Sequence, residues 1–255
     1  LQYHLTLSGS VGFFDKRLRL TGDGQTGSTF QGSFNNSGLG RNKSKSDFHI
    51  RRVYADADLM TSAEYLLMLS AGSMPHVYGY GNQVNTFDAD GWVSGYRLTS
   101  DWKSAKFVTT VGGIKKTTTP SYFERMSEMT EFNFAQGIYS RKMSDVMDMS
   151  VGYSYWKVFH YPMLALQYKC TSGSWIDNVF FEETYQKGSK NANMVQLGVG
   201  KGFSMFGEKF KSELSYFHRT QKYNLLSGDP ANSEFRGHSS LFKLTAPELY
   251  KSDLI

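Results

Sequence analysis

Apolar and polar residues alternate along much of this chain, most regularly between Val146 and Tyr155. One phase of that stretch is apolar or aromatic and consists of Met147, Met149, Val151, Tyr153 and Tyr155. The other phase is small or polar and consists of Asp148, Ser150, Gly152 and Ser154. Because side chains of a strand alternate between its faces, the stretch predicts a strand with one apolar and one polar face. A soluble sheet would bury the apolar face in a core, whereas a membrane-spanning barrel would turn it toward lipid and keep the polar face for its lumen.

About twelve alternating runs of this kind predict an all-β fold. They span residues 1–14, 47–61, 63–75, 87–102, 105–117, 129–142, 146–158, 162–171, 176–187, 192–205, 208–224 and 238–249. Helical periodicity is confined to short segments at 121–129 and near the C-terminus. Many runs are longer than the roughly 5–6 residues of ordinary globular strands and suit the about 9–11 residues that cross a bilayer at a tilt.

Short and longer connections alternate between these runs. The short, turn-like ones lie at 61–62, 103–104, 143–145, 171–174 and 206–208. The longer ones are mostly polar and rich in Gly, Asn and Lys, and span 15–46, 76–86, 118–128, 188–191 and 225–237, with a brief one at 160–161. Outer-membrane barrels of up-and-down topology carry tight turns at one end and long loops at the other, whereas Greek-key sandwiches need no such alternation. We therefore predict one domain over residues 1–255, an up-and-down antiparallel transmembrane β-barrel of about twelve strands or more, with both ends periplasmic.

The composition agrees with a β-barrel and excludes a helical membrane protein. The chain is 40% apolar with a mean hydropathy of −0.43, and no stretch approaches the roughly 18 consecutive apolar residues of a spanning helix. A β-barrel keeps such an average because only every second side chain of a strand faces lipid. Cys170 is the one cysteine, which excludes an internal disulfide and a cysteine-rich metal site. The chain starts at Leu1 inside an alternating run, so we expect a mature or trimmed form whose export signal is missing.

The stretch FHIRRVYADADL, from Phe48 to Leu59, is the most charged of the predicted strands. Its alternation changes phase at Arg51–Arg52, and a β-bulge there would account for the change. Both signs of charge suit a pore wall, because a transverse field between basic and acidic groups orients and filters solutes; on a soluble sheet the same residues would form surface salt bridges. The pore-lining candidates, assigned by alternation, are Arg51, Arg52, Asp56, Asp58, Asp88, Asp90, Arg97, Lys115 and Arg219.

The stretch DFHIRRVYADADLMTSAEYLLML (47–69), preceded by an alternating run and a long polar segment, resembles the opening hairpins of bacterial outer-membrane porins. It is most similar to the phosphate- and anion-selective type, in which an Arg-rich strand precedes a short turn and another strand. The resemblance implies a channel in a Gram-negative outer membrane, and porins often form homotrimers. Two features depart from the pattern. Such porins usually have more strands, and their chains usually close with an aromatic residue, whereas this chain ends PELYKSDLI; it is either a smaller barrel or lacks a segment.

The predicted loop 15–46 is the longest connection and carries an excess of basic residues. In porins a long early loop commonly folds into the lumen, and the resemblance implies that role here, with Arg17, Arg19, Arg41 and Lys43 as constriction-loop candidates. On physical grounds alone the loop is a flexible Gly/Ser/Asn-rich segment, and its basic residues could equally bind anionic lipopolysaccharide outside the barrel. Both interpretations stay open.

Patterns for catalysis and cofactor binding are weak. No G-x-S-x-G is present, and in GHSS (237–240) only Ser240 shares a strand face with His238. Asp88 and Asp90 could pair as in barrel proteases, but no histidine lies close to them in sequence. The six histidines show no metal-ligand spacing, and GVGKGF (198–203) lacks the Lys-Ser/Thr ending of a phosphate-binding loop. We expect no enzyme, no cofactor, no bound metal and no nucleic-acid partner.

The sequence thus predicts an outer-membrane pore for passive diffusion of small hydrophilic solutes or ions. The net charge of +5 favours some anion preference. Expected partners are outer-membrane lipid, lipopolysaccharide and small hydrophilic or anionic solutes. Two alternatives stay open: a barrel enzyme or non-conducting structural barrel, and a soluble all-β ligand-binding protein.

Overall fold

The computed structural model describes residues 4–27, 47–75, 92–114, 129–170, 173–188, 191–205, 208–220 and 237–245. These residues form one antiparallel sheet of 13 strands whose spatial order repeats their order in the chain. The strands are β1 (His4–Phe13), β2 (Leu18–Gly27), β3 (Asp47–Thr61), β4 (Tyr65–Pro75), β5 (Trp92–Trp102), β6 (Ala105–Gly113), β7 (Phe134–Lys142), β8 (Met147–Trp156), β9 (Phe159–Lys169), β10 (Asn178–Gln186), β11 (Ala192–Met205), β12 (Glu208–Arg219) and β13 (Gly237–Thr245). The predictions of an all-β fold and of up-and-down topology are confirmed.

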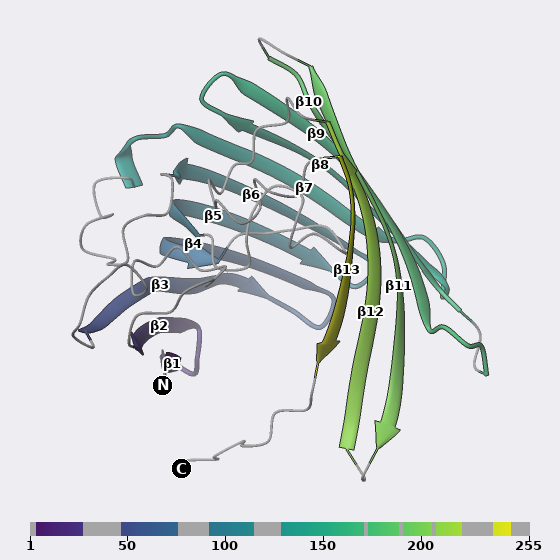
Figure 1. Cartoon of the computed structure of the whole chain (residues 1–255). Coiled ribbons are helices and arrows are strands. Elements are labelled where there is room, and N and C mark those ends of the chain that lie inside the picture. Colours follow the sequence, from purple (N-terminus) through teal and green to yellow (C-terminus); the bar gives the residue numbers. More distant parts are fainter. Residues whose placement is uncertain are drawn as a thin grey trace.

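The sheet curls around a central space, as Figure 1 shows. Strand twist accumulates over so many neighbours and bends a long meander into a partial cylinder. β1 and β13 are the two edges, and no pairing joins them among the described residues, so the sheet is not closed. Because all neighbours are antiparallel, β1 and β13 run in the same direction, and a direct pairing between them would be parallel. The first and last described residues, His4 and Thr245, therefore lie at opposite ends of the sheet, so the prediction of both ends on one side is wrong for the described residues.

β2 lies inside the segment that the sequence predicted to be one long loop, 15–46. Its residues pair with β1 on one side and with β3 on the other, so the loop prediction is wrong for 18–27. The glycines of β2 favoured a loop in the sequence, but a strand between two paired neighbours tolerates them since both of its backbone edges are hydrogen-bonded. Residues 28–46 lie outside the described residues.

The phase change predicted at Arg51–Arg52 is a β-bulge, as expected. Asp23 of β2 pairs with Arg52 and Gly24 pairs with Ile50, which leaves Arg51 without a partner on β2. A second shift follows where β3 meets β4, between Asp58 and Met60. Bulges of this kind sharpen the local bend of a strand.

The connections at the two ends of the sheet differ in length. One end, here called the short-turn end, carries the connections 14–17, 62–64, 103–104, 143–146, 170–177 and 206–207. The opposite end, here called the long-connection end, carries 28–46, 76–91, 114–133, 157–158, 187–191 and 220–236. The predicted alternation holds over most of the chain, and 157–158 and 187–191 are the short exceptions at the second end.

Strand alternation separates an inner face, turned into the curl of the sheet, from an outer face. In β10, for example, Phe180, Glu182 and Thr184 are buried, whereas Tyr185 points outward and is exposed. The inner face of β4, β5 and β6 carries paired glycines, Gly72 with Gly95 and Gly95 with Gly112. A Cβ at Gly95 would lie 2.1 Å from the Val111 carbonyl oxygen. Glycine is therefore required for the close backbone approach that accompanies the curl here.

Candidate functional site: the polar inner face

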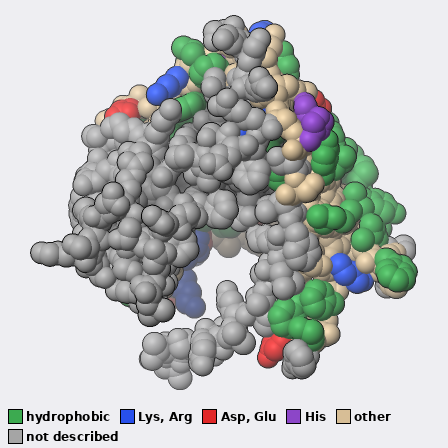
Figure 2. Space-filling view, in the orientation of Figure 1, with side chains coloured by type: hydrophobic (Ala, Val, Ile, Leu, Met, Phe, Trp, Pro, Cys, Tyr) green, Lys and Arg blue, Asp and Glu red, His purple; other side chains and the backbone are tan. Residues whose placement is uncertain are grey.

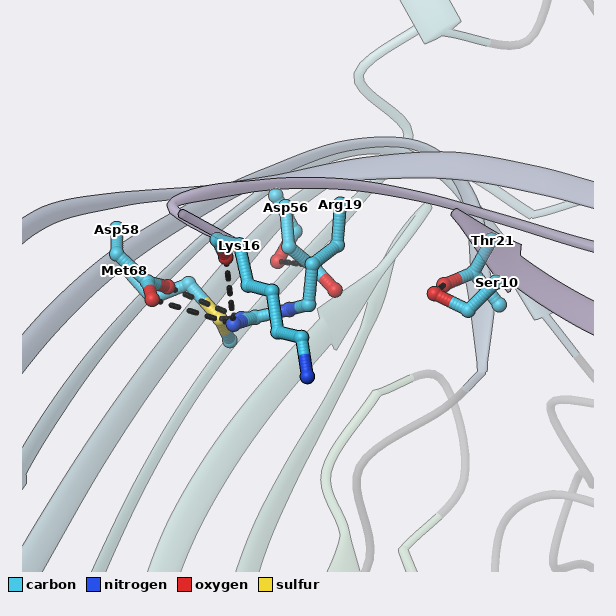
Figure 3. Close-up of polar contacts among 8 residues, drawn as sticks. Ser10, Lys16, Arg19, Thr21, Asp56, Asp58 and Met68 are labelled. Atoms are coloured by element: carbon cyan, nitrogen blue, oxygen red, sulfur yellow. Dashed lines mark hydrogen bonds and ion pairs between the residues drawn. The ribbon is translucent and has the colours of Figure 1, made fainter. Parts of the chain in front are cut away.

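Oppositely charged side chains line the inner face of β2 and β3. The Arg19 Nη1 and Nη2 atoms donate to the Asp58 Oδ2 and Oδ1 atoms at 3.1 and 3.0 Å, a bidentate ion pair (Figure 3). The side chains are 33% and 14% exposed, so the pair is partly withdrawn from water but still reached by it. On the same two strands, Arg52 Nε donates to Asp23 Oδ2 at 2.6 Å. Planar guanidinium groups suit such carboxylate contacts, which fix the geometry of both partners.

Asp56 lies between these two ion pairs. It is the cross-strand neighbour of Arg19, and it accepts a hydrogen bond of 2.6 Å from Ser70 Oγ on β4. The second carboxylate oxygen of Asp23 has no hydrogen-bond partner among the described residues. This oxygen is also buried, so it is not presented to a solute that passes the wall.

Arg97 continues this polar surface onto β5. It is the cross-strand neighbour of Ser70, and it donates from Nε to Thr110 Oγ1 at 3.1 Å and from Nη2 to the Pro75 carbonyl oxygen. Away from the strand ends, the described charged residues of this wall are Arg19, Arg52 and Arg97 against Asp23, Asp56 and Asp58. Since the two signs balance, the wall carries a field across its surface rather than a net charge.

From β6 to β12 the inner face is polar but buried. Thr110, Glu182 and Thr184 are fully shielded from solvent, and Gln136 and Gln196 are 6% and 1% exposed. Gln136 Nε2 donates to Ser154 Oγ on the neighbouring strand at 2.9 Å, whereas the buried Thr184 Oγ1 and Gln196 Oε1 atoms have no hydrogen-bond partner among the described residues. The charged side chains of β2 and β3 are less completely buried, with Arg19 33% and Arg52 18% exposed.

Toward the long-connection end, the inner face becomes apolar. A buried cluster there consists of Val93, Ile114, Phe134, Trp156, Tyr161, Ala192, Met194 and Phe217. Burial of these large side chains against one another stabilises the curl by the ordinary hydrophobic effect. The sequence did not predict the cluster, because its members stand in the same alternating phase as the polar inner residues.

The outer face is apolar and exposed. Large side chains with exposed fractions between 36% and 58% recur from β1 to β12, namely Leu7, Val11, Leu20, Leu69, Leu98, Phe107, Val151, Leu164, Leu197 and Leu214. Cross-strand pairs such as Val11 with Leu20, Leu69 with Leu98 and Val151 with Leu164 join them into a belt. Figure 2 shows hydrophobic side chains gathered along the right side of the molecule, where Figure 1 places the later strands. Apolar side chains exposed on so many neighbouring strands mark an interaction surface.

Aromatic residues mark both margins of this belt. At the short-turn end they are Phe13, Phe14, Tyr65, Trp102 and Tyr168. At the long-connection end the hydroxyl groups of Tyr153 and Tyr216 form hydrogen bonds with the Nδ1 atoms of His160 and His238. Amphipathic rings are favoured where an apolar zone meets water, since they present one apolar and one polar side.

Ion pairs border the short-turn end. Lys169 Nζ lies 2.7 Å from Asp148 Oδ2, and Lys106 Nζ lies 3.4 Å from Asp101 Oδ2. In the β7–β8 turn, Lys142 Nζ donates to Asp145 at 2.7 Å. This hydrogen bond, together with the charge of Lys142, holds the pKa of Asp145 below its ordinary value. Except for Asp148, whose side chain is 17% exposed, these groups are well exposed, and such pairs contribute little to stability.

The structure brings several of the predicted pore-lining residues onto one surface. Arg52, Asp56, Asp58 and Arg97 lie on the inner face within β3–β5. Arg219 also has inner phase, but it is 2% exposed, beside Met194 near the long-connection end. The Arg51 side chain and the residues Asp88, Asp90 and Lys115 lie outside what the structure describes.

The four constriction-loop candidates do not lie together in the structure. Arg17 lies in the β1–β2 turn and is exposed, and Arg19 lies on β2 within the charged wall. Arg41 and Lys43 lie outside the described residues. Sequence reasoning missed Asp23, which shares the alternating phase of Arg19 and Thr21 and would have been found had 18–27 been interpreted as a strand.

Within the described ranges, no group of three side chains could hold a metal ion, and no helix there is long and apolar enough to cross a bilayer. A scan of the sequence against protein-family models finds no match, and a search of curated proteins finds no significantly similar sequence. The site is therefore interpreted from its own geometry.

Proposed function

We propose that this chain is a bacterial outer-membrane pore through which small hydrophilic solutes or ions diffuse passively. The observation that carries the proposal is the division of the sheet into an exposed apolar outer belt with aromatic margins and a polar inner face. This is the arrangement that a lipid-embedded barrel requires, with lipid outside and water inside. Short turns at one end and longer connections at the other support the same assignment.

Selectivity in this proposal comes from the wall formed by β2, β3, β4 and β5. Alternating guanidinium and carboxylate groups there orient dipolar solutes, because the field runs across the path and not along it. The three arginines and three aspartates described on this wall give no anion preference by themselves. Any such preference rests on the overall net charge of +5.

Single-channel recording in a planar bilayer under a salt gradient tests the proposal. We expect stepwise openings. We also expect the double substitution Arg52→Gln/Asp23→Asn to alter conductance or ion selectivity, because it removes one ion pair from this wall. Lys103→Gln/Glu64→Gln, which removes an exposed pair in the β3–β4 and β5–β6 turns, serves as the control and should leave both unchanged. A reversal potential favouring cations would keep the pore and contradict the anion preference.

A second candidate is a barrel that does not conduct. The complete burial of Glu182, Thr184 and Gln186 on the inner face favours it, because a lumen filled by protein is closed to solutes. Insertion into the bilayer without channel openings would support this candidate over the pore.

A further inference from the structure

The end of the β11–β12 hairpin projects beyond its neighbours. Residues 202–205 of β11 pair with 208–211 of β12, whereas the pairing of β10 with β11 stops at Gly200 and that of β13 with β12 stops at Lys211. The projecting part is thus a two-stranded ribbon whose two outer edges have no pairing strand among the described residues. Figure 1 shows this hairpin reaching lowest of all the strands.

One face of this ribbon is aromatic and apolar. The rings of Phe203 and Phe210 stack with centroids 5.5 Å apart, and Phe203 and Met205 are 38% and 44% exposed. An ion pair separates this patch from the outer belt: Lys201 Nζ lies 2.7 Å from Asp177 Oδ1 and also donates to the Ser174 carbonyl oxygen. The adjacent Trp175 is 95% exposed. The patch is therefore a separate apolar surface at the short-turn end.

The other face is cationic. Lys209 and Lys211 stand opposite Ser204 and Gly202. These four residues line a groove of about 420 Å³, to which Asp177, Phe203 and Phe210 also contribute. Neither lysine forms an ion pair with a described residue. The nearby Asp177 does not neutralise them, because its oxygens already accept bonds from Lys201 and from the Gly202 backbone N–H at 2.6 Å. Glu208 belongs to the apolar face, opposite Met205.

We propose that residues 202–205 and 208–211 form an interfacial ribbon that binds a phospholipid leaflet. In this arrangement Phe203, Met205 and Phe210 contact acyl chains, and Lys209 and Lys211 contact the phosphate groups of anionic lipids. The pattern is the β-ribbon counterpart of an interfacial amphipathic helix, in which an apolar face enters the acyl boundary and a lysine-rich face stays among the headgroups. Charge complementarity selects an anionic lipid, since each lysine near such a surface gains about fivefold in the bound-to-free ratio. This inference rests on the membrane location in the proposed function and is independent of conduction.

An environment-sensitive fluorophore on the ribbon tests the proposal. Met205→Cys in a Cys170→Ser background places the label on the apolar face, and the protein is reconstituted in phosphatidylcholine alone or mixed with phosphatidylglycerol. We expect blue-shifted emission and quenching by brominated acyl chains, both stronger in the anionic mixture. Lys209→Gln/Lys211→Gln should lower the ratio of inserted to water-exposed label by roughly 30-fold. Lys103→Gln/Lys106→Gln removes two lysines at another turn of the same end and should leave that ratio unchanged.

Three outcomes would overturn the inference. The first is a label that stays in water in both lipid mixtures, and the second is quenching that does not depend on Lys209 and Lys211. The third is displacement of the label by free inorganic phosphate, which would make the groove a site for a soluble anion. Migration of unheated protein on a gel reports barrel insertion separately. If insertion fails, the folded protein is added to the same vesicles and the same label is measured. Gel migration then tests the membrane location in the pore proposal, and the label tests the ribbon proposal.

Discussion

At the scale of single residues, the bidentate Arg19–Asp58 pair is the contact most open to measurement. Arg19→Gln removes the guanidinium and leaves Asp58, which is 14% exposed, without its main partner. We expect the free energy of unfolding to fall by about 1–2 kcal/mol, less than for a fully buried pair because water still reaches Arg19. Urea unfolding of the reconstituted protein measures this, with Lys103→Gln as the control. That exposed pair, at 78% and 72%, should contribute less than about 0.5 kcal/mol, and equal losses would contradict partial burial of the Arg19 site.

Asp177 offers a second prediction at this scale, on pH dependence. The hydrogen bond from Lys201 and then the one from the Gly202 backbone hold its pKa below 3.8. A carboxyl whose folded pKa is lowered contributes stability above its unfolded pKa and loses that contribution as the pH falls through the folded value. Lys201→Gln should raise the pKa of Asp177 only part of the way to 3.8, since the Gly202 N–H still donates. Carboxyl ¹³C shifts followed against pH measure this, and Lys209→Gln should leave the pKa unchanged.

At the scale of strands, the glycines paired across β4, β5 and β6 set how closely the backbones approach. Gly95→Ala would place a Cβ 2.1 Å from the Val111 carbonyl oxygen, and backbone atoms cannot move aside as a flexible side chain can. We expect a loss of about 3 kcal/mol, the upper end for overpacking. Gly9→Ala in β1 is the matched control, because a Cβ there meets nothing within 4 Å, and it should change stability by less than about 1 kcal/mol. Similar stabilities for the two variants would show that the β4–β6 region relaxes freely.

The strands also show which information the sequence carried. Alternation predicted strands at 47–61 and 192–205, and the structure has β3 and β11 there. The prediction succeeds because a strand with one buried face alternates between apolar and polar residues. β2 was missed since its glycines masked the alternation, and only its pairing with two neighbours makes it a strand. The bulge at Arg51 was predictable as a local change of phase. The contact of Arg19 with Asp58 was not predictable from the sequence. It depends on the register between β2 and β3, and the sequence analysis assigned β2 to a loop.

At the scale of the whole molecule, the decisive question is what covers the outer belt. Val151 lies in the middle of β8, is 38% exposed and points outward. If the belt faces lipid, Val151→Arg places a charge near the bilayer midplane and should cost about 2–4 kcal/mol of folding free energy. Met143→Arg in the β7–β8 turn lies beyond the belt and should stay within about 0.5 kcal/mol. Unfolding titrations in phospholipid vesicles compare the two. A Val151→Arg protein that matches the control and stays folded without detergent would mean that water covers the belt, and the soluble alternative would then replace the pore.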